Sequence, residues 1–149
     1  MAATPADAQV IMQLYDLRRE PELRKARDWF AGQFHPQSVD DIMNTVMQFG
    51  SDGNRYFRMV TSYWEMAATM ANHGAVNEPL FLDTQQEMFF IFAKIHPFLE
   101  GFREKMGSPD AMKNVETLIN KSEASRKKLE VFKQRIERIR AMAMAAQKN

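Results

Sequence analysis

Histidine and carboxylate side chains at helical spacing are the features of this sequence that could hold a metal ion. His96 and Glu100 stand four residues apart, so on a helix they would share one face and could supply two ligands. A zinc site takes three or four protein ligands, and the neighbouring sequence offers no third one. We therefore expect no metal site here.

The three histidines share a second feature, which is a position next to a residue that ends helices. They occur as His35-Pro36, His73-Gly74 and His96-Pro97. A histidine near the C-terminal end of a helix is favoured by the negative end of the helix dipole. The sequence therefore predicts structural roles for all three histidines.

Residues 62–74, SYWEMAATMANHG, combine a tryptophan, a glutamate and methionines in one short stretch. Polar residues recur at steps of three and four along 54–72, which places Glu65 on a solvated stripe and Trp64 on the packed face. Methionine is a flexible filler of irregular cores, and the chain contains 12 of them. This stretch is therefore predicted to be the interior of a helical bundle and not a cofactor site.

Motifs of known catalytic chemistry are missing from the sequence. It contains no phosphate-binding Gly-rich loop, no G-x-S-x-G motif and no His-Glu-x-x-His helix. It also lacks cysteine, which excludes thiol nucleophiles, disulfides and cysteine-ligated metals. Glu87, Glu100 and Glu104 do not repeat the Glu-x-x-His spacing of di-iron bundles. We expect a protein that is not an enzyme, with no catalytic residues and no cofactor.

Basic residues are dense between positions 18 and 27. Arg18, Arg19, Arg24, Lys25 and Arg27 could bind an anion, but carboxylates at positions 16, 20, 22 and 28 interleave with them. Opposite charges three or four residues apart on a helix pair with each other. The pattern therefore predicts a solvated face that pairs with itself.

The elements that position these residues are helices, because helix start and stop signals recur and strand-like alternation does not. Helices are predicted to begin after Thr4, at Pro21, after Ser38 and behind Ser51 or Asp52. Another is predicted after residues 77–79, where Thr84 and Glu87 resemble a capping box. Pro97 should kink this fifth helix, and Gly101, Gly107 and Pro109 mark its end. The last helix is predicted to run from Pro109 without a break. The expected fold is an all-α bundle of about six helices.

The chain of 149 residues has an ordinary globular composition, with 45% hydrophobic and 26% charged residues. Its longest apolar run, MFFIFA at 88–93, is far shorter than the roughly 20 residues that span a bilayer. Because that run is apolar on every side, we expect Phe90 to be core, like Trp64. The N-terminal residues MAATPADAQV show no secretory signal, so a cytoplasmic protein is expected.

Three segments carry a resemblance to a known family: LYDLRREPELRKARDWF, FRMVTSYWEMAATMANHGAVNEPLF and IHPFLEGFREKM. They pair an Arg- and Leu-rich early helix with an aromatic central helix that ends in glycine, followed by a helix that closes on a basic residue. Over its first 106 residues the chain resembles the bacterial helical family known as domain of unknown function 4760. The resemblance implies an all-helical fold, and since the family has no established activity it implies no catalytic residues.

The region after residue 108 has a different pattern. Hydrophobic residues follow a heptad repeat from Val115 to Ala146, which predicts a long coiled-coil-like helix, softened by serines at 122 and 125. Residues 121–149 hold nine basic and three acidic side chains, a net charge of +6, which leaves eleven basic and sixteen acidic ones, or −5, for residues 1–120. We predict a bundle body at 1–108 and a basic helix at 109–149 that packs on the body or extends from it.

The heptad pattern makes this helix the expected site of interaction. We expect its apolar seam and its basic flank to dock on an acidic helical surface, either of the body or of a partner protein, through Leu129, Phe132, Ile136, Ile139, Lys128, Lys133 and Arg135. A parallel homodimer is disfavoured, because it would set one basic flank against another. Two alternatives remain open: binding of anionic lipid or nucleic acid by the basic helix, and an unrecognised small-ligand-binding protein.

Overall fold

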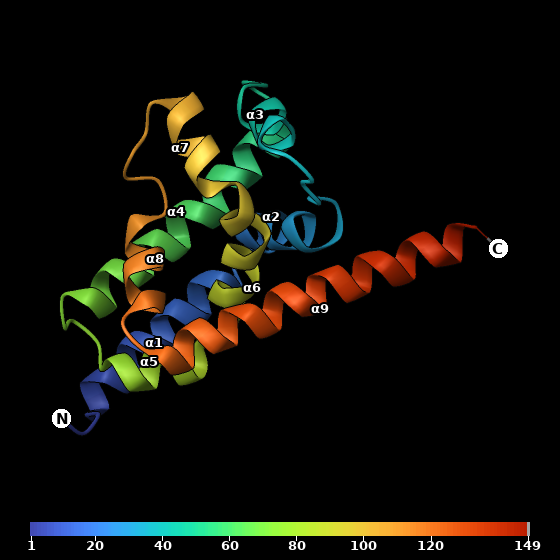
Figure 1. The fold of residues 1–149 in the computed structure, drawn as a ribbon. Helices are drawn as coiled ribbons and strands as arrows, with labels where there is room; N and C mark the ends of the chain where they lie inside the picture. The colour runs from blue at the N-terminus through green and yellow to red at the C-terminus, as the bar shows by residue number, and fades with distance from the viewer. Residues whose placement is uncertain (149) are drawn as a thin grey trace.

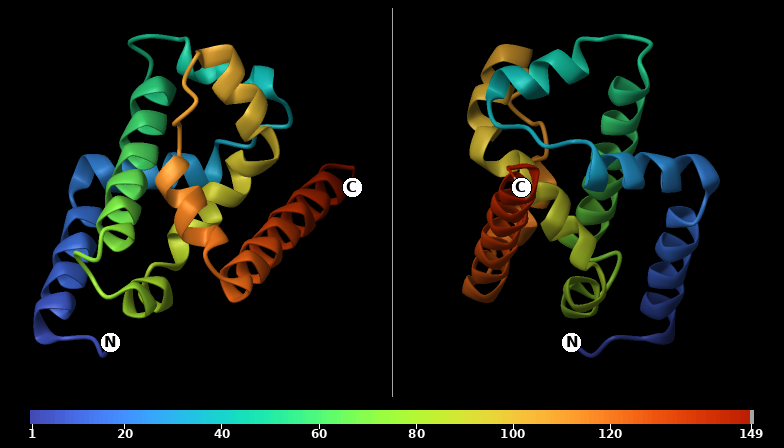
Figure 2. Two further views of the ribbon diagram at one scale, coloured as in Figure 1. Left: turned by 60° about the vertical axis from the view of Figure 1, so that its left-hand side comes forward. Right: turned by 90° about the vertical axis from the view of Figure 1, so that its right-hand side faces the viewer.

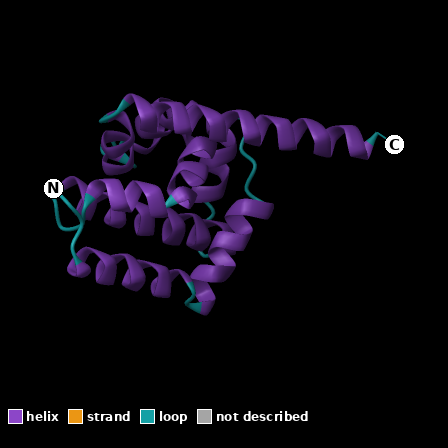
Figure 3. Ribbon diagram, turned by 90° about the horizontal axis from the view of Figure 1, so that it is seen from below, coloured by secondary structure: helices purple, strands orange, loops and turns teal. Residues whose placement is uncertain are grey.

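The protein is all-helical, as the sequence predicts. A computed structural model describes residues 1–148, and within them there are nine α-helices, one 3₁₀ helix and no strand (Figure 3). The number exceeds the expected six because the fifth predicted helix is divided into several elements and the last one into two. None of the helices in the described part of the chain is long and apolar enough to cross a membrane.

The first four helices begin at the predicted caps. They are α1 (Pro5–Arg18), α2 (Pro21–Gly32), α3 (Val39–Val46) and α4 (Asp52–Asn72). Thr4 and Asp7 cap α1 reciprocally, and the hydroxyl groups of Ser38 and Ser51 accept backbone N–H groups at the starts of α3 and α4. These local hydrogen bonds satisfy N–H groups that have no partner inside a helix, which is why the caps were readable from sequence.

The fifth predicted helix is broken at two places. Its elements are α5 (Glu78–Thr84), α6 (Gln86–Ile95), η1 (His96–Phe98) and α7 (Leu99–Met106). The predicted kink at Pro97 is confirmed, since the proline lies within η1. The predicted capping box of Thr84 and Glu87 is wrong: the Thr84 hydroxyl donates to the Leu80 carbonyl at 2.8 Å, and Glu87 pairs with arginines of other helices.

Two glycines that were expected to end this region have different roles. Gly107 does end α7, with a φ of +62° that favours glycine. Gly101 lies inside α7, where an added Cβ would be only 2.6 Å from Cγ2 of Val39 on α3. A glycine is needed there because α3 and α7 approach closely.

The core forms around α4, which contacts α2, α3 and α8 (Figure 1). Trp64 on α4 is fully buried, as predicted. Most of the apolar run on α6 is buried too, including Phe89 and Phe92. Phe90 is only partly buried, so its assignment to the core was wrong; it faces a groove described below.

The segment that follows residue 108 contains two helices, α8 (Lys113–Asn120) and α9 (Glu123–Gln147), and not the single helix that was predicted. The physical reason is Ser122, whose hydroxyl accepts the backbone N–H of Ser125 at 3.1 Å and so starts a new helix. Val115 and Leu118 on α8 are fully buried, and α8 packs against α4 as part of the body. The heptad seam is therefore interrupted between α8 and α9.

Helix α9 crosses the body beside α6 and then continues past it. Figures 1 and 2 show its C-terminal end standing away from the other helices, and the view from below in Figure 3 agrees. Its N-terminal part contacts α6 and α8. Docking on the body and projection from it, the two arrangements expected for this helix, thus occur in different halves of α9.

Candidate functional site

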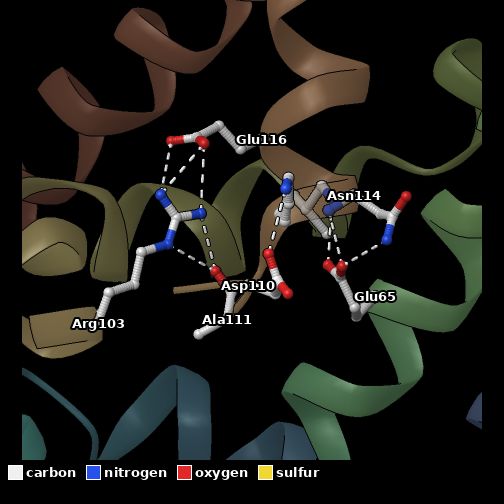
Figure 4. Close-up of polar contacts among 8 residues, drawn as sticks. Glu65, Arg103, Asp110, Ala111, Asn114 and Glu116 are labelled. Atoms are coloured by element: carbon white, nitrogen blue, oxygen red, sulfur yellow. Dashed lines mark hydrogen bonds and ion pairs between the residues drawn. The ribbon is translucent and has the colours of Figure 1, made fainter. Parts of the chain in front are cut away.

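The central glutamate has a structural contact that the sequence did not reveal. Glu65 was expected on a solvated stripe, but it is half-buried and points at the start of α8 (Figure 4). Its carboxylate accepts the backbone N–H groups of Asn114 at 2.7 Å and Val115 at 3.2 Å. Since α8 has no side-chain cap of its own, Glu65 serves as the cap from another helix.

Arg103 holds the turn between α7 and α8. Its guanidinium donates to the carbonyl of Ala111 at 2.8 Å and pairs with Glu116 at 3.2 Å (Figure 4). That turn ends at Met112, which has a left-handed φ of +56°. Together with Glu65, Arg103 anchors the N-terminal end of α8, so the polar cluster of Figure 4 stabilises the fold.

The basic cluster at 18–27 is only partly the self-paired face that was predicted. Lys25 pairs with Glu22 on the same helix. Arg18 and Arg27 are instead largely buried and pair with Glu87 on α6, with N–O distances of 3.2 and 2.6 Å. The hydrogen bonds that Arg27 donates to the Glu87 carboxylate raise the pKa of Arg27. Both guanidinium groups are committed to this ion pair, which joins α1 and α2 to α6.

The histidines lie apart from one another. Burial, with a smaller effect of the nearby Lys133, lowers the pKa of His96. His35 lies beside the end of α2, with Nε2 3.0 Å from the Gly32 carbonyl oxygen. Within residues 1–148, no group of three or more histidine, aspartate or glutamate side chains could hold a metal ion.

The apolar residues expected to bind a partner divide along α9. Leu129 is 5% exposed and belongs to the core, and Phe132 and Ile136 are partly buried against it. The ring of Phe132 stacks on that of Phe89 with centroids 6.2 Å apart. Ile139 lies beyond this contact and is 55% exposed. The structure thus brings three of the four residues onto the body and leaves one in solvent.

The basic residues expected to meet an acidic surface have other neighbours. Lys128 lies over the ring of Phe89 at 5.1 Å, and Arg135 lies over the ring of its own helix neighbour Phe132 at 4.8 Å. Lys133 pairs with Glu130 at 3.3 Å. In the described part of the chain, every ion pair of α9 lies within α9 itself. On the body, Lys128 therefore meets the ring of Phe89 and not a carboxylate, and within residues 1–148 the expected pairing of this basic flank with acidic residues of the body is not present.

A groove lies where α9 begins to leave the body. It has a volume of about 350 Å³ and is lined by Phe90 and Lys94 of α6, by His35 after α2, and by the face of α9 from Ile136 to Gln147. We call it the α9 groove. Most of its surface is apolar, and sequence reasoning missed it because the three segments that form it are far apart in the chain.

Lys94 is the buried charge beside the α9 groove. Its Nζ donates to the carbonyl oxygens of Phe30 at 2.7 Å and Phe34 at 2.8 Å, so it caps the C-terminal end of α2. Burial lowers the pKa of Lys94 to about 8, and the positive charge of Arg140 adds to the effect. Three backbone carbonyls within hydrogen-bonding distance favour the charged ammonium and give Lys94 a structural role.

Comparison with known proteins identifies the family. The family model described as Domain of unknown function (DUF4760) matches residues 3–122. The chain belongs to this family. Neither a curated protein nor a solved structure matches it.

The DUF4760 match extends further than the resemblance seen in the sequence, which covered the first 106 residues. It includes α8 and stops at Ser122, the residue that caps α9. In this DUF4760 protein the matched region is therefore the body without α9. The α9 groove has one wall inside the matched region and one wall outside it.

Proposed function

We propose that this DUF4760 protein is a non-enzymatic interaction module that binds a partner protein through the projecting half of α9. The supporting observation is the exposure of apolar side chains there: Ile139 is 55% exposed, Met142 66% and Met144 55%. Ile139 continues the seam that Leu129 and Phe132 use to dock on α6, and Met142 and Met144 lie further along the projecting half of α9. Exposed apolar side chains gathered on one element mark interaction surfaces.

The partner contact would resemble a coiled coil, with a helix of the partner lying along α9. The acidic surface expected from the sequence then belongs to the partner and not to this protein's own body. We propose the bacterial cytoplasm as the setting, as expected from the sequence and the resemblance.

Binding of anionic lipid or nucleic acid is a weaker candidate. Three basic residues of α9 pair with carboxylates on the same helix, namely Lys127, Lys133 and Arg140. Such pairs reduce the net charge that a phosphate-rich surface would attract. A small-ligand protein is the remaining alternative, and the α9 groove is the place where a ligand would bind.

Site-specific photo-crosslinking in cells tests the proposal. A photoreactive amino acid in place of Ile139 should join the protein to a defined partner, because this position faces the proposed contact. The same amino acid in place of Lys105, which is exposed on α7, should not. Equal products from both positions, or products only with lipid or nucleic acid from position 139, would contradict the proposal.

A further inference from the structure

The α9 groove combines an apolar surface with positive charge. Lys94 and Arg140 both line it, together with His35, and no carboxylate is among its lining residues in the described part of the chain. The two cations lie close enough for Arg140 to affect the ionisation of Lys94. An anion at this place would be attracted by both charges.

Arg140 is the cation that can contact an anion directly. It is partly exposed and donates to Glu137 at 3.2 Å and to the Pro36 carbonyl at 3.2 Å. A guanidinium has five N–H groups, so these two contacts leave others for a ligand. Lys94 is 5% exposed and uses its N–H groups on the end of α2, so it contributes charge and no contact.

The apolar part of the groove has the length of a short helix, so one face of such a helix could lie along it. Phe90 of α6 forms one side, and Ile136, Ile139 and Ala143 of α9 form the other. The α9 face from Ile136 to Gln147 is about 16 Å long at the rise of an α-helix, which is three turns. Apolar side chains at i, i+3 or i+4 and i+7 of a partner helix would lie along this length.

We propose that the α9 groove binds an acidic amphipathic helix of the partner protein, whose apolar face packs against Phe90 and Ile139 and whose carboxylate pairs with Arg140. This inference rests on the proposed function and identifies the acid-binding residue. It transfers that role from Lys128, Lys133 and Arg135, which do not line the groove, to Arg140, which does.

A second copy of this chain fits the groove less well through its own α9. Beyond Ile136 the described part of α9 carries one carboxylate, Glu137, and that carboxylate pairs with Arg140 at 3.2 Å. The three glutamates of α9 each already pair with a lysine or arginine of the same helix. A membrane surface fits less well too, because the groove is a recess between helices and apolar on most of its surface.

Binding of two matched peptides to the full-length protein tests the inference. Both peptides are helical, about four turns long, with leucines at i, i+3, i+4 and i+7. One carries glutamates beside the leucines, and the other carries glutamines at the same positions. By fluorescence anisotropy we expect the acidic peptide to bind roughly tenfold more tightly, equivalent to about 1.4 kcal/mol.

Variants of α9 assign the preference to a residue. Arg140→Gln should remove most of the preference for the acidic peptide, while Arg138→Gln, a neighbouring arginine that does not line the groove, should leave it unchanged. Ile139→Ser should weaken binding of both peptides. Arg138 and Ile139 are exposed, and Arg140 has only a single hydrogen bond to the body, at the Pro36 carbonyl. We therefore expect the thermal unfolding of each variant, measured beside binding, to stay close to that of the parent.

Several outcomes would overturn the inference. Equal binding of the two peptides, or equal effects of Arg138→Gln and Arg140→Gln, would show that Arg140 does not bind a carboxylate of the peptide. Dimers in light scattering that are lost in Ile139→Ser would assign the groove to a second copy, and displacement of the acidic peptide by anionic vesicles would assign it to lipid. If the two peptides bind equally, or the two arginine variants have equal effects, the proposed function still holds provided that crosslinking at position 139 yields a partner. The proposed function and the inference both fail if neither peptide binds and no partner is crosslinked.

Discussion

Gly101 sets the distance between α7 and α3. An added Cβ would meet Cγ2 of Val39 at 2.6 Å, which is closer than side chains tolerate. We expect Gly101→Ala to lower the free energy of unfolding by about 1–3 kcal/mol through this overlap.

The sign of this effect should reverse when Val39 is shortened. In a Val39→Ala background, the overlap is removed and alanine gains its helix propensity, about 1 kcal/mol over glycine. Urea denaturation of the four proteins of this double-mutant cycle measures the coupling. A loss of stability by Gly101→Ala that is the same in both backgrounds would show that Val39 is not the obstacle.

Other single residues act as caps over long distances in the chain. Glu65 closes the start of α8, and Lys94 closes the end of α2. The sequence pattern placed Glu65 on a solvated stripe and indicated no role for Lys94. Their capping roles depend on helix ends that fold next to them.

At the level of elements, α9 has two halves with different energetics. It is 25 residues long and α6 is 10, so at the α-helical rise of about 1.5 Å per residue α9 is more than twice as long as the helix it docks on. The docked half buries Leu129, and the projecting half exposes Ile139.

We therefore expect a substitution by alanine to cost much more stability in the docked half than in the projecting half. Leu129→Ala should reduce the free energy of unfolding by about 2–5 kcal/mol, because it leaves a cavity. Ile139→Ala should change it by less than about 0.5 kcal/mol, as is usual for a surface position. Chemical denaturation measures both. A similar loss in both variants would mean that the end of α9 also packs on the body.

For the whole molecule, Glu87 joins α1 and α2 to α6. It accepts hydrogen bonds from Arg18 and Arg27, which are 69 and 60 residues away in the chain. All three side chains are more than three-quarters buried, so loss of the carboxylate would leave two cations poorly solvated.

Glu87→Gln is therefore expected to lower the free energy of unfolding by about 2–4 kcal/mol, somewhat below the value for a fully buried pair. Its control is Glu22→Gln, which removes the exposed pair with Lys25 and should cost less than about 1 kcal/mol. Thermal unfolding of both variants provides the comparison. Equal effects would show that the pair of Glu87 is as weak as a surface pair.

The positions of most helices were determined by the sequence alone. Thr4, Ser38 and Ser51 cap helices through hydrogen bonds to residues three positions later, and Pro97 interrupts one because its ring prevents helical bonding. Because these interactions join residues close together in the chain, the sequence alone determines where the helices begin and end. The all-helical class and the buried position of Trp64 follow from the same helical periodicity.

The tertiary structure alone decided which charges are structural and where the candidate site lies. Glu65, Glu87 and Lys94 meet their partners 49 to 69 positions away, and the α9 groove joins segments separated by about a hundred residues. Ser122 shows the limit of a periodic pattern, because the heptad repeat treats it as a weak core position while its hydroxyl starts a helix. A heptad repeat predicts which residues share a face of a helix. Which part of that face is buried depends on how the other helices pack, and on α9 the buried part ends near Ile136.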